Sequence, residues 1–139
     1  MRIIGVHIDK SKAIFYTLEK KPNGEIFHFP SDRNYLTLTN DTDNESVRAF
    51  QSSIHSFFDS IKPDRIAILI RQTKGRFRSA PLSFKIEGLI QCYKKVEVEF
   101  VQPMKVSGYF KKNEFPLQTE HDYQEPAAKL AYYLLSGSE

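Results

Sequence analysis

The sequence predicts an α/β domain in which a mixed five-stranded sheet, its first three strands antiparallel, carries helices on both faces. Three observations lead to this prediction. Residues 2–39 contain β-branched runs separated by turn signals, residues 45–61 have apolar side chains at helical spacing, and residues 65–70 form a continuous apolar run. Because a strand that returns through a helix joins the sheet in parallel, this order of patterns predicts both strand orientations.

The N-terminal part reads as antiparallel strands. Two β-branched runs, RIIGVHID (2–9) and KAIFYTLE (12–19), are separated by a gap short enough for a hairpin. The turn signal KPNG follows, and two weaker strand candidates lie at 25–29 and 34–39. We expect the third antiparallel strand in this region.

Helices and strands alternate from residue 45 onward. The most regular helix covers 45–61, where one face carries the apolar side chains Val47, Phe50, Ile54, Phe57, Phe58 and Ile61. The run at 65–70 is typical of a strand covered on both faces. A second helix is predicted over 81–94, a strand over 96–101 and a C-terminal helix over 122–135.

Two finer predictions concern single residues. Asp122 and Glu125 have the spacing of a capping box, and Pro126 is tolerated in the first turn of the helix that they would open. Cys92 is expected to be an inert core residue, because free cysteines are usually buried.

Composition limits the class of protein. A chain of 139 residues, 40% of them hydrophobic, suits a single domain over 1–139. The net charge of only +3 means that any binding of nucleic acid must come from local clusters of cations. A single cysteine excludes an intramolecular disulfide and a cysteine-based zinc site. Neither a leader pattern nor an apolar run of about 20 residues is present, so we expect a cytoplasmic protein without membrane contact.

A cationic segment follows the predicted strand at 65–70. The segment carries Gly75, Phe77 and four cations without an acid among residues 71–80: Arg71, Lys74, Arg76 and Arg78. Lys85 adds a fifth cation at the start of the next helix. Ligands of open α/β sheets gather at the carboxyl ends of the strands, so these cations are predicted to contact a nucleic-acid backbone, with Phe77 stacking on an unpaired base. The alternative interpretation is a solvated surface with Phe77 in the core. The glycine spacing does not fit a Walker motif.

Four stretches carry a resemblance to a known family: RIIGVHI at the start, TKGRF, the following FKIEGLIQ, and QE before the last helix. In these stretches the chain resembles a bacterial family of unknown function related to the RuvC-type Holliday-junction resolvases. The similarity covers nearly the whole chain. It implies a ribonuclease H-like fold, which is also the fold that the predicted order of elements describes.

The resemblance implies a position for a catalytic centre. In catalytic proteins of this fold, acids from the first strand, the fourth strand and the last helix hold two metal ions that cleave a phosphodiester. The matching positions in this sequence are His7, Ile70 or a neighbour, and Glu125 or Asp122. Magnesium prefers hard oxygen ligands, so isoleucine cannot replace an acid and histidine is a poor substitute.

Asp9 offers a partial replacement for the missing acids. It lies two residues after His7, so both side chains point to the same face of a strand. Asp9 also fits the turn before the second strand, where acids are common. His7 has three interpretations: a hydrogen-bonded structural histidine, a ligand for a soft metal, or part of an anion site. His121 is expected near Glu125 on the face that carries His7.

Three functional hypotheses follow from these residues. The leading one is a ribonuclease H-like module that binds nucleic acid or a partner and needs no cofactor. The second is a nuclease that uses Mg²⁺ or Mn²⁺, held by Asp9, Glu125 and an unidentified third ligand. The candidate metal ligands are Asp9, Asp122 and Glu125. The third is a structural or assembly protein whose basic segment binds an acidic protein. A homodimer is plausible by analogy with the resolvases.

Overall fold

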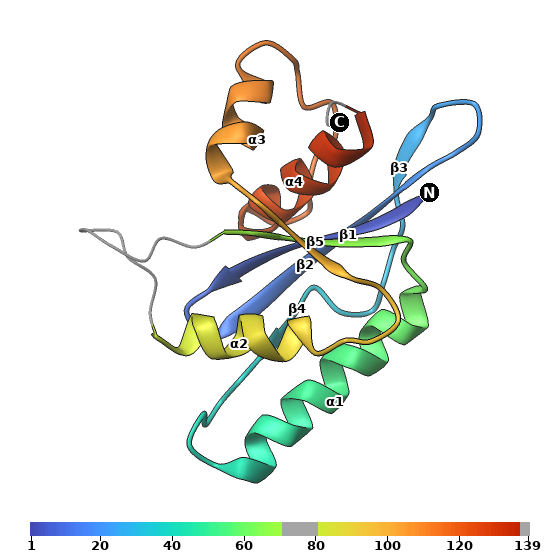
Figure 1. Cartoon of the computed structure of the whole chain (residues 1–139). Coiled ribbons are helices and arrows are strands. Elements are labelled where there is room, and N and C mark those ends of the chain that lie inside the picture. Colours follow the sequence, from blue (N-terminus) through green and yellow to red (C-terminus); the bar gives the residue numbers. More distant parts are fainter. Residues whose placement is uncertain (71–80, 137–139) are drawn as a thin grey trace.

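The computed structural model describes residues 1–70 and 81–136. Within these ranges six strands form one mixed sheet (Figure 1): β1 (Arg2–Asp9), β2 (Lys12–Lys20), β3 (Ile26–His28), β4 (Tyr35–Thr37), β5 (Arg65–Leu69) and β6 (Val98–Val101). The strand order is β3-β2-β1-β5-β6, and β4 pairs with β2. The β1–β2 and β2–β3 pairs are antiparallel, whereas β1–β5 and β5–β6 are parallel, as predicted.

The prediction of five strands is corrected to six. Both weak candidates form short strands, because each pairs with a different half of the same edge of β2. β3 lies opposite residues 18–20 of β2, and β4 lies opposite residues 12–14. The third antiparallel strand of the prediction is therefore divided into two pieces.

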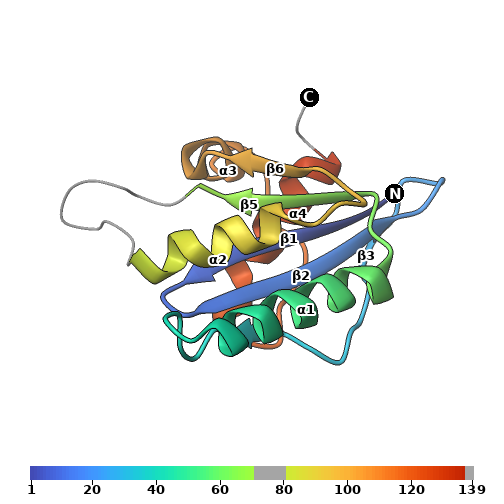
Figure 2. The ribbon, with the colours of Figure 1, turned by 60° about the horizontal axis from the view of Figure 1, so that its bottom comes forward.

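Helices cover both faces of the sheet, which confirms the predicted layers. The described helices are α1 (Asn44–Ile61), α2 (Pro81–Gln91), α3 (Pro103–Phe110) and α4 (Glu125–Ser136), and a 3-10 turn, η1 (Asp122–Gln124), precedes α4. Helices α1 and α2 lie on one face and α4 lies on the other, with α3 beside it (Figures 1 and 2). None of these described helices is long and apolar enough to cross a membrane.

Helix α1 matches its prediction because its signals are local. The Asp43 carboxylate accepts a hydrogen bond from the Ser46 N–H at 3.1 Å and caps the first turn. At the other end Lys62 adopts a left-handed conformation with φ of 56°, and Pro63 follows, which cannot continue a helix. Both ends are thus set by residues adjacent to the apolar stripe.

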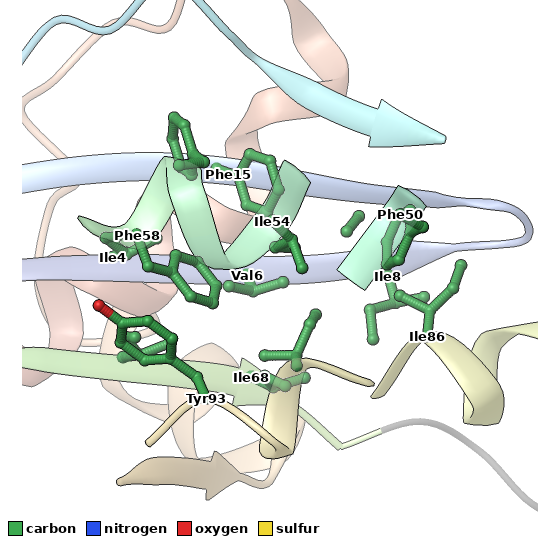
Figure 3. Packing of buried hydrophobic residues seen from close by; sticks show 14 of the residues in the cluster. Ile4, Val6, Ile8, Phe15, Phe50, Ile54, Phe58, Ile68, Ile86 and Tyr93 are labelled. Carbon is green, nitrogen blue, oxygen red and sulfur yellow. The ribbon is translucent and has the colours of Figure 1, made fainter. Parts of the chain in front are cut away.

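The sheet separates two hydrophobic cores. On the α1 and α2 face, side chains from β1, β5 and both helices interlock (Figure 3), among them Ile4, Val6, Ile8, Phe50, Ile54, Phe58, Ile68 and Ile86. On the α4 face, Ile3 and Leu18 pack against alanines and leucines of the helix. Because side chains of a strand alternate between faces, Gly5, His7 and Asp9 lie on the α4 side.

Three local predictions need correction. Helix α2 ends at Gln91 rather than 94, the strand after it begins at Val98 rather than 96, and α3 was not predicted. Cys92 is exposed, not buried. The buried position after the helix belongs to Tyr93, whose hydroxyl donates to an Asp59 carboxylate oxygen at 2.7 Å, so the chain turns Cys92 outward.

Candidate nucleic-acid interface

One end of the sheet carries Asp9 and Ile70, two of the residues singled out in the sequence. We call it the carboxyl edge and define it by Asp9, Lys10, Ile70 and Pro81. The Ser83 hydroxyl in the first turn of α2 donates to the Lys10 carbonyl at 3.0 Å, which fixes the start of α2 against the β1–β2 turn. Ile70 follows β5, and its N–H donates to the Val101 carbonyl at 2.9 Å. The parallel register of β1 and β5 brings their ends to this same edge (Figure 2).

Most of the predicted interface lies outside the described residues, namely Arg71, Lys74, Arg76, Phe77 and Arg78. The neighbouring Ser79 lies outside them as well. The residues that flank this segment, Ile70 and Pro81, are both at the carboxyl edge. Lys85 is described and exposed, and its ammonium donates to the Asp41 carbonyl at 2.6 Å. Lys85 therefore lies beside the loop that precedes α1.

His7 lies on the α4 side of the sheet and is half-buried. Its Nδ1 atom is buried and has no hydrogen-bond partner among the described residues. The described residues therefore supply no hydrogen bond to this atom for the interpretation of His7 as a hydrogen-bonded structural residue. Burial lowers the pKa of the imidazole below its usual 6.5, and the negative charge of Asp9 opposes this in part. The folded chain thus favours a neutral His7.

The fourth-strand position beside His7 is apolar. Val6 pairs with Ile68, so one further step of the same parallel register places Leu69 beside His7 on the α4 face. Leu69 packs against the core of that face. Ile70, the position that the family resemblance implied together with its neighbours, comes one residue later and by strand alternation belongs to the opposite face. Neither side chain can supply an oxygen ligand.

The two acids of the last helix and its preceding turn, Glu125 and Asp122, are exposed at the surface. Glu125 is the first residue of α4, is exposed, and has its carboxylate 3.5 Å from the Lys129 ammonium. Asp122 is exposed and opens η1. The predicted Asp122–Glu125 capping box is wrong, because the helical turn begins one residue earlier and the Gln124 side chain accepts from the His121 N–H at 2.8 Å.

The residues at the three family positions do not fit a two-metal centre. Leu69 takes one of these positions, and Glu125 already has a cationic neighbour. Asp9 is exposed at the end of β1. Among residues 1–70 and 81–136, no three side chains of the His, Cys, Asp and Glu types are close enough together to hold a metal ion. A metal role for Asp9, Asp122 or Glu125 therefore has no geometric support here.

An aromatic patch, which we define as Lys12, Tyr35, His121 and Tyr123, completes this edge. In the register of the sheet His7 pairs with Ile14 and Ile14 pairs with Tyr35, so Tyr35 shares the face of His7. Tyr35 is 39% exposed and Tyr123 38% exposed, and their ring centroids are 5.8 Å apart.

The patch also carries positive charge. The Lys12 ammonium lies 4.5 Å from the centre of the Tyr35 ring, and the His121 ring stacks on Tyr123 at 5.1 Å. Sequence reasoning placed His121 near Glu125 but missed both tyrosines, because they come from distant parts of the chain. The alternation of residues 34–39 was the signal that could have assigned Tyr35 to the polar face.

Three solved structures with a similar architecture are Holliday-junction resolvases. RuvC from Thermus thermophilus is 12% identical with a TM-score of 0.70, and the match covers 96% of this chain and 95% of that one. T. thermophilus RuvC in complex with a Holliday junction substrate is 14% identical with a TM-score of 0.65, covering 99% and 97%. The yeast mitochondrial Holliday junction resolvase is 9% identical with a TM-score of 0.54, covering 78% and 53%. At these identities the similarity establishes the ribonuclease H-like fold that the sequence predicted.

Sequence comparison gives the family. Among curated proteins, none matches this chain. A family model described as "Protein of unknown function (DUF3010)" matches residues 1–134. The chain therefore belongs to the DUF3010 family and has a RuvC-like, ribonuclease H-like fold.

Proposed function

We propose that this chain binds nucleic acid at its carboxyl edge and does not cut it. The observation that carries the proposal is Leu69, an apolar residue beside His7 at the position where the fold of the catalytic relatives carries an acid. A phosphodiester-cleaving centre of that kind needs converging oxygen ligands. Nucleic acid is the ligand class because a protein of the same fold was solved with a Holliday junction substrate.

Positive charge supports the same ligand class. The sequence places Arg71, Lys74, Arg76 and Arg78 between Ile70 and Pro81, the two residues that bracket the carboxyl edge. Lys10 and Lys12 are exposed at the turn between β1 and β2. These cations would contact phosphates, which position a nucleic acid without reading its sequence.

The aromatic patch suggests that part of the ligand is unpaired. Half-exposed tyrosines next to a lysine can stack on a base while the ammonium neutralises its phosphate. Phe77 would serve the same purpose from the basic segment. A duplex with a single-stranded branch would use both sets of contacts, and we propose such branched nucleic acid as the preferred ligand.

Neutralising two arginines tests this proposal. The double variant Arg76→Ala with Arg78→Ala should bind a branched DNA more weakly, and the slope of log affinity against log salt should fall by about 0.9 for each lost phosphate contact. The matched control is Lys111→Ala with Lys112→Ala, which removes two exposed cations after α3. Equal affinity and slope for parent and Arg76/Arg78 variant would contradict the proposal.

The two other hypotheses are separate outcomes of the same series. Incubating the protein and the branched DNA with Mn²⁺ should give no cleavage. Cleavage that disappears in Asp9→Asn would establish the nuclease instead. An acidic polypeptide that competes as well as DNA would favour the acidic protein partner.

A further inference from the structure

A groove runs along α1, on the face of the sheet opposite α4. At its first end is a hollow of about 600 Å³, lined by Leu36, Thr37, Thr39, Asp43, Glu45, Ser46, Ala49, Phe50 and Ser53. A second hollow of about 310 Å³ is lined by Asp32, Arg33, Ser52, Ser53, Ser56, Phe57 and Ser60. Because Ser53 lines both, the two hollows adjoin, and they are lined by residues 32–39 around β4 on one side and by α1 on the other.

The β4 wall of the groove is a free strand edge. Within the described ranges β4 pairs with β2 alone. The Phe15 N–H donates to the Asn34 carbonyl, and the Leu38 N–H donates to the Ser11 carbonyl, both at 2.9 Å. Antiparallel pairs alternate between hydrogen-bonded and non-hydrogen-bonded positions, so the main-chain groups of Tyr35 and Thr37 point away from β2. Thr37 also lines the first hollow.

The α1 wall is made of small side chains. Six of the nine α1 residues that line the two hollows are serine or alanine, so a strand added to β4 would find room for its side chains beside the helix. Phe50 and Phe57 form the apolar floor. Helix α1 has 18 residues, which corresponds to about 27 Å and therefore to an extended segment of about eight residues.

The acidic side chains of the first hollow favour a segment that carries a basic residue. Its charged side chains are both acidic, and while Asp43 caps α1, the exposed Glu45 carboxylate is available. The opposite edge of the sheet differs, because the chain leading into and along β6 carries Lys94, Lys95 and two glutamates, and charges of this kind discourage strand addition. The β4 residues Tyr35, Leu36 and Thr37 carry no charge.

We propose that the β4–α1 groove binds an extended peptide segment of a partner protein, which adds a strand to β4 and places a lysine or arginine against Glu45. Main-chain hydrogen bonds to Tyr35 and Thr37 would hold the segment. Alternate side chains would enter the groove, as in other strand-addition complexes. This inference does not depend on the nucleic-acid proposal, because the groove shares no residue with the basic segment. Tyr35 is common to both proposals, but the peptide would use its main chain and the nucleic acid its ring.

The test starts from a phage-displayed library of random twelve-residue peptides, selected on the full chain. Enriched peptides should contain a β-branched run with a basic residue. Their binding should slow hydrogen exchange of the Tyr35 and Thr37 amides and leave β6 unchanged. Thr37→Pro removes an outward N–H and keeps the pairing with β2, since proline is tolerated on strand edges, and should weaken binding at least about tenfold.

A second variant keeps the test independent of how well the proline is tolerated. Glu45→Lys should also weaken peptide binding, by about tenfold, while Glu114→Lys, the same change at an exposed acid far along the chain, should not. Peptides that bind Thr37→Pro and Glu45→Lys as tightly as the parent and Glu114→Lys would overturn the proposal. Peptides that protect amides outside β4 would also overturn it. So would a dimer of the chain alone that Thr37→Pro dissociates, because the occupant would then be a second copy.

Discussion

From Ile4 to Ile8 one face of β1 carries only isoleucine and valine, whereas the other face changes along the strand from isoleucine to glycine, histidine and aspartate. The first face is closed by α1 and α2, and its residues Ile4, Val6 and Ile8 are at most 4% exposed. The second face meets α4 closely at Gly5, leaves the His7 Nδ1 atom unpartnered among the described residues, and ends at the exposed Asp9. A single strand thus combines a face that stabilises the fold with a face that forms the candidate site.

Truncating the packed face should have the largest effect on stability. Phe58 is fully buried between β1, Phe15 and Tyr93. We expect Phe58→Ala to lower the free energy of unfolding by about 3–5 kcal/mol, because it removes a large ring and leaves a cavity. Urea denaturation measures the change. A loss below about 1 kcal/mol would show that this face is less tightly packed than described.

A methyl group at the α4 contact should have the next largest effect. A Cβ atom on Gly5 would collide with the Ala127 carbonyl oxygen. Gly5→Ala should therefore cost about 1–3 kcal/mol of unfolding free energy as α4 is displaced. The matched control is Gly88→Ala in α2, where nothing lies within 4 Å of the added atom and stability should rise by up to about 1 kcal/mol. Equal effects of the two substitutions would contradict the close contact.

Replacing His7 should change the pH dependence of stability. Since burial lowers the folded pKa of His7 below 6.5, the unfolded chain binds more protons than the folded chain between these two values. This contribution to stability is fully present above pH 6.5 and is lost as the pH falls through the folded pKa. His7→Leu should remove that loss and, by eliminating an unpartnered Nδ1, raise stability at neutral pH by about 1 kcal/mol.

The measurement is the free energy of unfolding of both proteins from about pH 5 to about pH 8. The wild-type curve should rise more steeply than the His7→Leu curve below pH 6.5. His28 also has a pKa lowered by burial and is present in both proteins, so the difference between the curves reports His7 alone. Parallel curves would contradict this account of His7.

The smallest expected effect belongs to Glu125. Its carboxylate forms a surface pair with Lys129, and such pairs contribute about 0.5 kcal/mol or less. Glu125→Gln should leave stability nearly unchanged and should not weaken the binding of branched DNA. A loss of affinity that appears only when Mn²⁺ is present would show instead that Glu125 acts as a ligand.

Sequence patterns predicted the elements whose signals are local. Helix α1 was predicted within one residue of its start, because its cap and its apolar stripe are adjacent in the chain. Helix α3 was missed since it buries only Val106 and its fit depends on contacts such as Tyr109 with Tyr133 of α4. Residues 25–39 were recognised as strand candidates, but their division along β2 depends on long-range pairing.

For the candidate site, too, the sequence predicted the features that depend on local patterns and missed those that depend on long-range pairing. Strand alternation correctly grouped His7 with Asp9 on one face. The fourth-strand position was assigned to Ile70 or a neighbour, and only the register between β1 and β5 shows that Leu69 is the residue beside His7. Tyr35 and Tyr123 meet through tertiary structure alone, so no pattern in the sequence could pair them.

The contact between Gly5 and Ala127 joins the first strand to the last helix of the described chain. Closing so long a loop costs conformational entropy before the contact is formed, so α4 is expected to dock late in folding, after the hairpin of β1 and β2. Until then the His7 face is open to solvent. Hydrogen exchange should accordingly report α4 as a unit that opens at lower free energy than the sheet, and each opening would expose the candidate interface from the side of the helix.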